Sequence, residues 1–530
     1  MTIRTSRVEF ASAGRGSAPL GAVALALIAL VLAALLLAEP ASAAASCESL
    51  SSLKLQDTTI TAAEAVAAGA FAPPAPARGG RGGKGGGGNP YANLPAFCRV
   101  AATIKPSTDS DIKIEIWMPA TGWNNKFEAD GNGAWTGSIT QNTLAAGVAL
   151  GYATSMTDTG HEGGSASFAL GHPEKQIDFG YRAVHELAVK SKAIITAFYG
   201  QAPKYSYWNG CSAGGKQGLK EAQMFPGDFD GIIAGTPVSD WVGRALGAVW
   251  MGQATHETEG SAIPQAKYAA IHKGALDACD ALDGVKDGVI ENPEACKFDP
   301  VVMQCKGEDS NDCLTAAQVT TARKVYSGVI NPRTKEQIFP GLMPGSEMGW
   351  GTQVGANPFG PGLDEFRFVV FKNPDWDYKT MNFDSDVAAA VKADNNMMNA
   401  MDPNLKPYFD RGGKILQYHG WADQQMSPGN SPKYYKMVLE KLGGASKVMD
   451  NYRLFMVPGM GHCGGGDGTD TFDKRVVLEQ WVEQKKAPEQ IIATHMATGR
   501  TRPLCPYPQV AVYKGTGSTD DAANFSCKAK

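Results

Sequence analysis

Apolar residues along this chain recur with two different periods, and stretches of the two kinds alternate. Residues 112–117 read Ile-Lys-Ile-Glu-Ile-Trp, an apolar–polar alternation that predicts a half-buried β-strand. Residues 182–199 have apolar positions at helical spacing and predict an amphipathic helix. Further short strands are expected at 229–235, 413–420 and 452–457, and further helices at 432–441 and 471–485. Strands that alternate with helices predict an α/β fold, with a largely parallel sheet covered on both faces.

The alternation stops between residues 239 and 399. This stretch is rich in Trp, Met, Gly and Pro, and it holds four of the ten cysteines. We interpret residues 239–399 as a large inserted lid domain over the carboxyl-terminal edge of the sheet. The core of the fold is then expected in two parts, residues 44–238 and 400–530.

Residues 205–215 predict a nucleophile elbow. An aromatic, strand-like run ends in Gly-Cys-Ser-Ala-Gly at 210–214, which fits G-x-S-x-G, and a helix-compatible segment follows at 216–224. Small residues two before and two after Ser212 let the backbone crowd together at a strained turn. Ser212 is therefore the candidate nucleophile, and the N–H of Ala213 is a candidate oxyanion donor. The alternative is a chance match, because the chain contains 62 glycines.

A serine nucleophile needs a histidine base that is itself oriented by a carboxylate. On an α/β sheet these partners are expected after the serine in the order acid, then histidine, each just past a strand. Asp423 follows the strand at 413–420, and His462 lies in a Gly-rich loop after the strand at 452–457. Ser212, Asp423 and His462 are thus the predicted catalytic triad.

Three further residues are candidates for the same site. Gly131 and Gly133 lie in a glycine-rich turn at 130–135, and a backbone N–H from this turn is expected as the second oxyanion donor. His419 lies close to Asp423 in the sequence. It is a candidate for lining the substrate pocket, and a structural role is the alternative.

Two cysteines flank the proposed catalytic residues. Cys211 directly precedes Ser212, and Cys463 directly follows His462. If the serine and the histidine touch, the two cysteines are close enough for a disulfide. The alternative is two unrelated buried cysteines.

The N-terminus resembles an export signal. Arginines precede an apolar run at 20–38, and Ala-Ser-Ala at 41–43 provides small residues for cleavage, so residues 1–43 are predicted to be a signal peptide. An uncleaved anchor and a lipid attachment at Cys47 are the alternatives. We expect a secreted or periplasmic protein without stable membrane association, whose cysteines form disulfides.

Residues 78–89 are dominated by glycine and predict a flexible exposed loop. Cys47 and Cys98 flank this loop, and a disulfide between them would fix its ends. An Arg/Gly tract can also contact RNA, but a solvated loop suits an exported chain better. The formal net charge of −4 likewise favours no nucleic-acid partner.

The motifs carry a family resemblance. Cys-Ser, a distant Asp and His-Cys, together with residues 123–127, 210–215, 225–231 and 419–423, resemble the tannase and feruloyl esterase family over roughly 97–527. The family includes mono(2-hydroxyethyl) terephthalate hydrolase. The resemblance implies an α/β-hydrolase core with a lid domain that hydrolyses esters of hydroxylated aromatic acids. The glycine-rich segment at 79–88 looks like an insertion, and Trp-Asn-Asn at 123–125 has Asn where the family often has Gly.

An acidic loop in the proposed lid is suited to a metal. Its carboxylates and two main-chain carbonyls are hard oxygen ligands of the kind Ca²⁺ prefers, and they come from Asp280, Asp283, Val285, Asp287 and Val289. A solvated acidic turn is the alternative. The family resemblance implies a structural Ca²⁺ here, and no organic cofactor is expected. The remaining cysteines are then expected to form the local disulfides Cys279–Cys296, Cys305–Cys313 and Cys505–Cys527.

Together these features predict a secreted serine carboxylic-ester hydrolase of the feruloyl esterase type, acting on a small aromatic ester. Aromatic residues between Trp241 and Trp376 are the expected walls of the acyl pocket. A tannase acting on galloyl esters and a terephthalate monoester hydrolase are the alternative enzymes. A phenolic- or carbohydrate-binding protein on a hydrolase scaffold is the alternative without catalysis.

Overall fold

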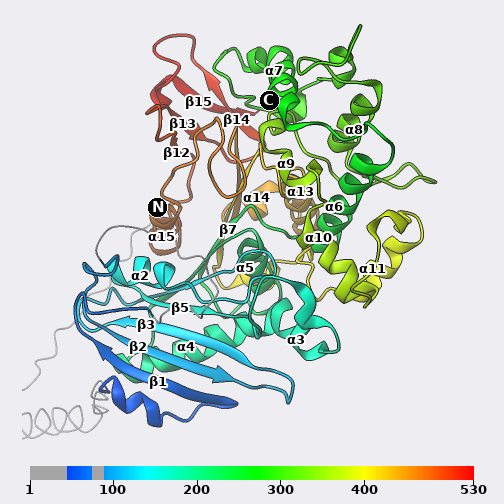
Figure 1. Ribbon diagram of the computed structural model, residues 1–530. Coiled ribbons are helices and arrows are strands. Elements are labelled where there is room, and N and C mark those ends of the chain that lie inside the picture. The colour runs from blue at the N-terminus through cyan, green and yellow to red at the C-terminus, as the bar shows by residue number, and fades with distance from the viewer. Residues whose placement is uncertain (1–44, 74–88, 530) are drawn as a thin grey trace, which may run out of the picture. The chain divides into compact units, whose positions relative to one another are not determined.

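A nine-stranded sheet organises the chain, with the strand order β1-β2-β3-β5-β4-β6-β7-β10-β11 (Figure 1). The structure, a computed structural model, describes residues 45–73 and 89–529. The predicted signal peptide and residues 78–88 of the glycine-rich loop lie outside the described residues. Among the described helices, we find none with the length and apolar character that a membrane crossing requires.

The first three strands are antiparallel, and from β4 onward the neighbouring strands run parallel. β3 joins the two parts by an antiparallel pairing with β5. The sheet consists of β1 (Thr58–Val66), β2 (Phe97–Ile104), β3 (Ile112–Pro119), β4 (Lys126–Asp130), β5 (Ala153–Thr157), β6 (Tyr205–Cys211), β7 (Gly231–Gly235), β10 (Lys414–Gly420) and β11 (Tyr452–Val457). The predicted α/β fold with a mostly parallel sheet is confirmed.

The strand predicted as half-buried is buried on both faces over most of its length. In β3 the expected alternation of buried and partly exposed residues is seen only at Ile112 and Lys113, and every residue from Ile114 to Pro119 is buried. Its Glu115 is tolerated there because its carboxylate accepts hydrogen bonds from Arg99 Nε at 2.7 Å and Trp117 Nε1 at 2.7 Å.

Helices cover both faces of the sheet. On one face, α4 (Ala183–Tyr199), α5 (Ala213–Met224) and α13 (Asn430–Leu442) contribute apolar residues to the largest hydrophobic cluster. On the other face, α15 (Lys474–Gln484) packs on β7, β10 and β11, and α2 (Gln141–Ala149) packs on β3 and β5. α15 begins later than predicted because the Asp473 side chain caps it by accepting the N–H of Val476. The short helices α3 (Pro173–Ile177), α12 (Lys406–Asp410) and α14 (Ala445–Val448) lie in connections.

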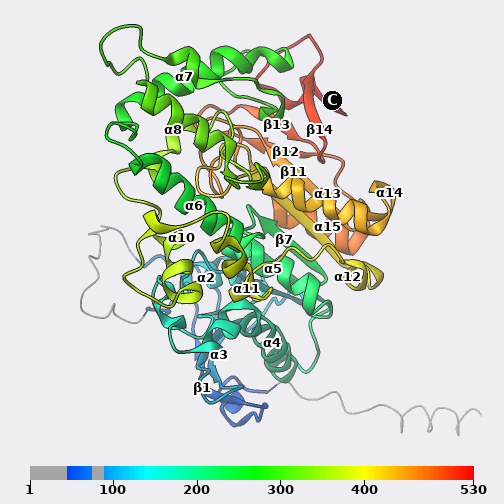
Figure 2. The same cartoon turned by 90° about the vertical axis from the view of Figure 1, so that its right-hand side faces the viewer.

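The chain between β7 and β10 is mostly helical. Figures 1 and 2 show α6, α8 and α10 next to one another, and their apolar residues form two clusters of their own. Its elements are α6 (Trp241–His256), α7 (Tyr268–Cys279), α8 (Ala316–Ser327), β8 (Val329–Ile330), β9 (Gln337–Phe339), α9 (Gly351–Val354), α10 (Gly360–Asp364) and α11 (Asp386–Asp394). The assignment of 239–399 as a separate lid domain stays a prediction.

Two short hairpins end the chain, and the sequence pattern did not predict them. They are formed by β12 (Ile491–Thr494) with β13 (Thr501–Leu504), and by β14 (Gln509–Tyr513) with β15 (Phe525–Ala529). Ala511 and Phe525 pack on Val285, which belongs to the acidic loop after α7. The C-terminus therefore supports the predicted calcium loop.

Candidate active site

Ser212 lies at a sharp turn between β6 and α5. It has φ 62° and ψ −121°, a conformation that is costly for a residue with a side chain and is typical of a functional constraint. The neighbouring glycines allow this turn. A Cβ at Gly210 would lie 2.4 Å from the carbonyl carbon of Gly214, so a larger residue would push the helix away. The strand, turn and helix of the predicted nucleophile elbow are all present.

The predicted acid and base are in contact. His462 Nδ1 lies 2.9 Å from Asp423 Oδ2, and the Asp423 side chain is fully buried. Its other oxygen accepts the N–H groups of Gln425 at 2.7 Å and Met426 at 2.9 Å. Burial alone would raise the pKa of Asp423, but the charge of His462 and a hydrogen bond from His419 outweigh it and hold that pKa well below its usual range. Asp423 is therefore a buried carboxylate in contact with His462, the arrangement expected of the acid in a catalytic triad.

A disulfide brings the serine and histidine loops together. Cys211 and Cys463 are bonded with their Cα atoms 6.1 Å apart, as the sequence predicted. Within the described residues, however, no hydrogen bond of 3.5 Å or less joins Ser212 to His462. Such contacts are often long in unliganded enzymes and tighten with substrate. The other predicted pairs are also bonded: Cys47–Cys98, Cys279–Cys296, Cys305–Cys313 and Cys505–Cys527.

Comparison with known proteins identifies the family of the chain. The profile of a family described as tannase and feruloyl esterase matches residues 98–528. The chain belongs to this family. It is 38% identical over 540 aligned positions to an uncharacterized esterase of Xanthomonas campestris pv. campestris, with 92% of each chain covered. It is 35% identical over 455 positions to a probable feruloyl esterase B of Aspergillus clavatus, covering 81% of this chain and 86% of the relative.

Solved structures in the family have the same fold. Feruloyl esterase B from Aspergillus oryzae superposes with a TM-score of 0.84 at 30% identity, covering 91% of this chain and 99% of the other. Tannin acyl hydrolase from Aspergillus niger gives a TM-score of 0.75 at 23% identity, covering 90% and 93%, and supports the fold alone. This member of the tannase and feruloyl esterase family is an α/β-hydrolase and a carboxylic ester hydrolase.

The structure corrects one predicted oxyanion donor. The N–H of Gly131 donates to the carbonyl of Asn209 at 3.0 Å, so it is not available to a ligand. Gly131 is required for another reason: a Cβ there would lie 2.5 Å from Cα of Gly214, at the start of α5. In the part of the chain that the structure describes, the N–H groups of Ala213 and Gly133 form no hydrogen bond. These two remain the candidates.

His419 is not placed to line a pocket, contrary to the first of its two predicted roles. Its side chain is fully buried, and its Nε2 lies 3.2 Å from Asp423 Oδ2. Sequence position placed it near Asp423 correctly. The sequence could not show that α13 covers this side of β10, which is what excludes His419 from solvent.

An apolar cluster surrounds Ala213 beside the elbow. It contains Trp241, as expected, and Phe368 packs at its edge. Trp376 is not part of it, because that ring packs on Phe366 and Phe371 with centroids 5.2 Å away in both cases. Three aromatic members of the cluster come from the first part of the core and were not predicted from the sequence: Trp135, Phe168 and Phe179. The position of Trp135 at the end of the glycine-rich turn at 130–135, beside the expected oxyanion donor, could have predicted its place in this cluster.

The predicted calcium loop folds back on itself. Asp280 accepts the N–H of Asp287 at 3.1 Å and that of Gly288 at 3.0 Å. Asp283 and Asp287 line a cavity of about 10 Å³ together with Glu291, a size suited to one small ion or water. One oxygen of Asp287 also pairs with Arg502. The oxygen donor set fits a hard cation, and Glu291 is a further carboxylate that the sequence analysis did not single out.

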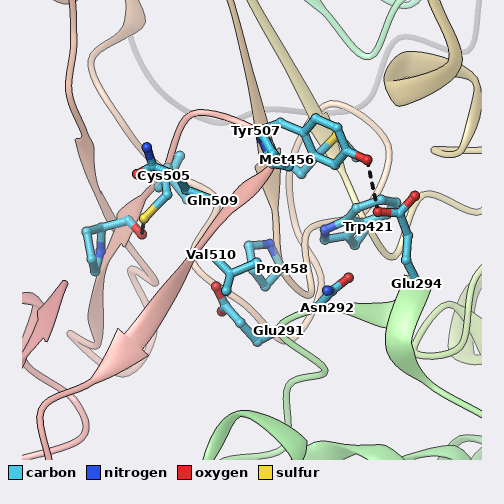
Figure 3. A pocket seen from close by; sticks show the side chains of 13 residues that line it. Glu291, Asn292, Glu294, Trp421, Met456, Pro458, Cys505, Tyr507, Gln509 and Val510 are labelled. Carbon is cyan, nitrogen blue, oxygen red and sulfur yellow. Dashed lines mark hydrogen bonds between the residues drawn. The ribbon is translucent and has the colours of Figure 1, made fainter. Parts of the chain in front are cut away.

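A separate cavity of about 130 Å³ is lined by Trp421, two residues before Asp423, and by residues of the C-terminal hairpins. Figure 3 shows Trp421 at one wall, facing the Tyr507 side chain, whose hydroxyl donates to Glu294 at 3.2 Å. None of the three proposed triad residues lines this cavity. It is therefore distinct from the acyl pocket expected beside Ser212.

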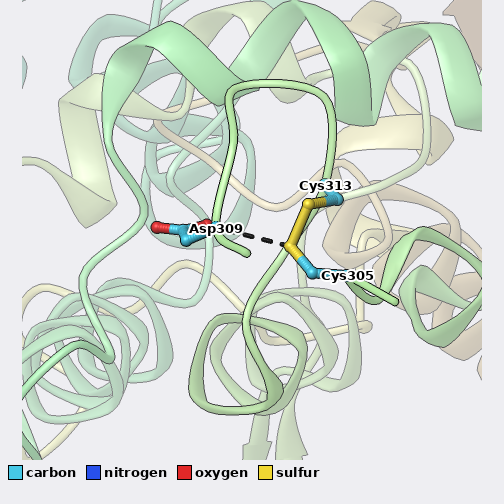
Figure 4. A group of neighbouring side chains, drawn as sticks. All are labelled: Cys305, Asp309 and Cys313. Atoms are coloured by element: carbon cyan, nitrogen blue, oxygen red, sulfur yellow. Dashed lines mark hydrogen bonds between the residues drawn. A yellow bond between two sulfur atoms is a disulfide. The ribbon is translucent and has the colours of Figure 1, made fainter. Parts of the chain in front are cut away.

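Two other clusters hold side chains of metal-binding type. Cys305, Asp309 and Cys313 lie together, but the two sulfurs are joined in a disulfide and are not thiolate ligands (Figure 4). His185, Glu221 and Asp228 form a partly buried group between α4 and the end of α5. There His185 Nδ1 lies 2.6 Å from Asp228 Oδ2.

Proposed function

We propose that this chain is an exported serine esterase that cleaves esters of hydroxylated aromatic acids, as feruloyl esterases do. The observation that carries the proposal is the pairing of His462 with the buried Asp423 at 2.9 Å. The disulfide Cys211–Cys463 joins the loop of His462 to the residue directly before Ser212. The relatives named feruloyl esterase B, at 30% and 35% identity, suggest the substrate class.

In the proposed reaction, Ser212 Oγ attacks the ester carbonyl while His462 Nε2 accepts its proton. The negative charge of Asp423 stabilises the imidazolium that forms. The tetrahedral oxyanion accepts hydrogen bonds from the N–H groups of Ala213 and Gly133. His462 then returns the proton to the leaving alcohol, and the acyl group stays on Ser212. Water, deprotonated by His462, releases the aromatic acid and restores the serine.

The acyl group is proposed to contact the aromatic cluster beside Ala213. Trp135 and Trp241 pack edge-to-face with centroids 4.8 Å apart, and Trp135 stacks on Phe179 at 4.9 Å. Such rigid apolar walls suit a planar aromatic acid. Phe368 brings the segment between β7 and β10 to the same cluster, which agrees with a lid role for that segment.

We also propose a structural Ca²⁺ at the acidic loop. Asp280, Asp283 and Asp287 would bind it through carboxylates, and Val285 and Val289 through main-chain carbonyls. The ion would neutralise an acidic cluster that Arg500 and Arg502, which both pair with Asp287, balance incompletely. It lies outside the proposed triad, so its expected contribution is to stability.

Labelling and substrate comparison test the function. A fluorophosphonate should label Ser212, and p-nitrophenyl acetate should give a burst of p-nitrophenol, whereas a binding protein on the same scaffold would show neither. Methyl ferulate, methyl gallate and a terephthalate monoester should then be compared by kcat/KM. The highest value is expected for methyl ferulate, and a preference for methyl gallate would identify a tannase instead.

A further inference from the structure

Asp423 accepts hydrogen bonds from two imidazoles through the same oxygen. His462 Nδ1 lies 2.9 Å from Asp423 Oδ2, and His419 Nε2 lies 3.2 Å from the same atom. An ionised carboxylate only accepts hydrogen bonds, so both ring nitrogens must donate to it. In the proposed reaction His462 is the histidine that accepts and returns the proton. The fully buried His419 has no role in it.

The other nitrogen of His419 belongs to a buried chain of hydrogen bonds. His419 Nδ1 lies 2.7 Å from Ser431 Oγ, and Gln417 Nε2 donates to the same hydroxyl at 2.7 Å. Tyr452 donates its hydroxyl proton to Gln417 Oε1. The five side chains of this chain are all completely buried: Tyr452, Gln417, Ser431, His419 and Asp423.

The donors in this chain can all point in one direction. Ser431 accepts from the Gln417 amide, so its own proton is free to go to His419 Nδ1. That leaves His419 neutral, with its single proton on Nε2 and directed at Asp423. Hydrogen bonds aligned in this way polarise one another, and inside a protein they are stronger than in water. The chain runs from β11 through β10 and α13 to the carboxylate.

We propose that His419 is a positioning residue that fixes the Asp423 carboxylate toward His462 and withdraws negative charge from it. This inference rests on the proposed function of the triad. By sharing the charge of Asp423, the Nε2–H of His419 reduces the stabilisation of protonated His462. The base is then free of its proton at a lower pH than it would be beside an unshared carboxylate.

The surroundings leave few other charges to produce such an effect. The ionisable groups that act on Asp423 are the imidazoles of His462 and His419. The groups of α13, β10 and β11 that take part in the hydrogen-bonded chain are neutral: the hydroxyls of Ser431 and Tyr452 and the amide of Gln417. A change at His419 should therefore be read out through His462.

Two amide variants separate positioning from packing. In His419→Gln the amide nitrogen reaches the place of Nε2 and keeps the donor to Asp423. In His419→Asn the shorter amide reaches only the place of Nδ1, so the bond to Ser431 can persist while the bond to Asp423 is lost. Both variants leave a buried cavity, which makes them matched controls for stability.

The measurement is kcat/KM for a p-nitrophenyl ester against pH, with the melting temperature of each variant. His419→Asn should lose about tenfold or more in kcat/KM. The acid limb of its pH profile, where kcat/KM falls at low pH, should move up by about half a pH unit or more. His419→Gln should restore both toward wild type. An Asn variant with the wild-type acid limb, or a Gln variant as impaired as Asn, would overturn the proposal.

A milder variant and a parallel control complete the test. If His419→Asn does not fold, Ser431→Ala removes the donor to Nδ1, and its acid limb should still move upward; an unmoved limb would count against the proposal. Ser212→Ala is assayed alongside. If it stays active, the proposed function itself fails. If it is inactive while the His419 variants behave like wild type, only the role of His419 fails.

Discussion

Cys211 and Cys463 are bonded to each other across 252 residues of sequence, each next to a proposed catalytic residue. Cys463 has φ 64°, so the histidine loop, like the elbow, takes a conformation that is unfavourable for a residue with a side chain. The disulfide fixes two strained loops relative to each other. Within the described residues no hydrogen bond joins Ser212 to His462, so the disulfide is the direct link between the two catalytic residues' loops.

Removing this disulfide should lower kcat by more than the accompanying loss of stability explains. A loop this long corresponds to about 4–5 kcal/mol of chain entropy, and measured values are often lower. Catalysis is more sensitive, because a displacement of about 1 Å between nucleophile and base can cost about 100-fold. We expect Cys211→Ala with Cys463→Ala to fold but to lose about 100-fold in kcat at a temperature well below its Tm.

The matched control is the pair Cys305→Ala with Cys313→Ala, which removes a half-buried disulfide that is next to none of the proposed catalytic residues. That variant should keep its kcat. Both double variants are assayed the same number of degrees below their own Tm. Equal losses of kcat would contradict a positioning role for Cys211–Cys463.

Ser212→Ala and His462→Ala should each lower kcat by about 10⁴-fold or more. The two residues act as one unit in the proposed mechanism, so the double variant should be little worse than either single one. Tm of Ser212→Ala should stay close to wild type, since the hydroxyl does not fill the core. His462→Ala should lower Tm, because the fully buried Asp423 carboxylate loses one of its partners. A product of the two single effects in the double variant would show that the residues act independently.

Much of this site follows from sequence because each triad residue comes just after a strand. The limits are equally specific. Gly131 was expected to offer its N–H, but β4 pairs with β6 up to Asp130 and Asn209, and the N–H of Gly131 extends that ladder by one bond. A one-residue extension depends on strand register, which local pattern does not encode. The aromatic wall from Trp135 to Phe179 is likewise assembled by long-range packing.

Chelation should lower stability without abolishing the chemistry. If Asp280, Asp283 and Asp287 hold Ca²⁺, EDTA should lower Tm and added Ca²⁺ should restore it by mass action. Activity measured well below the lowered Tm should change little, because the acidic loop is outside the triad. Asp283→Asn should lower Tm in calcium and should respond less to EDTA. Identical melting curves with and without chelator, and no calcium by elemental analysis, would exclude the ion.

Glu221 and Asp228 provide a test of electrostatics away from the catalytic residues. Glu221 is 1% exposed, and neither of its oxygens accepts a hydrogen bond from a donor in the described chain. Burial first, and then the neighbouring Asp228 carboxylate, hold the pKa of Glu221 well above its usual range. The folded protein therefore keeps a proton on Glu221 at pH values where the unfolded chain has released it.

The sign of the pH effect follows from this difference. Below the unfolded pKa, about 4.3, both states are protonated and Glu221 adds no pH dependence. As pH rises from there toward the raised folded pKa, folding requires proton uptake, and this residue lowers stability by up to about 1.4 kcal/mol per pH unit. Glutamine resembles the protonated carboxyl and needs no proton. Glu221→Gln should thus raise Tm at pH 8 and leave it nearly unchanged near pH 4. Glu440→Gln, at an exposed position of α13, should show no such difference between the two pH values. A Glu221→Gln variant less stable than wild type at pH 8 would mean that the carboxyl is ionised in the folded protein.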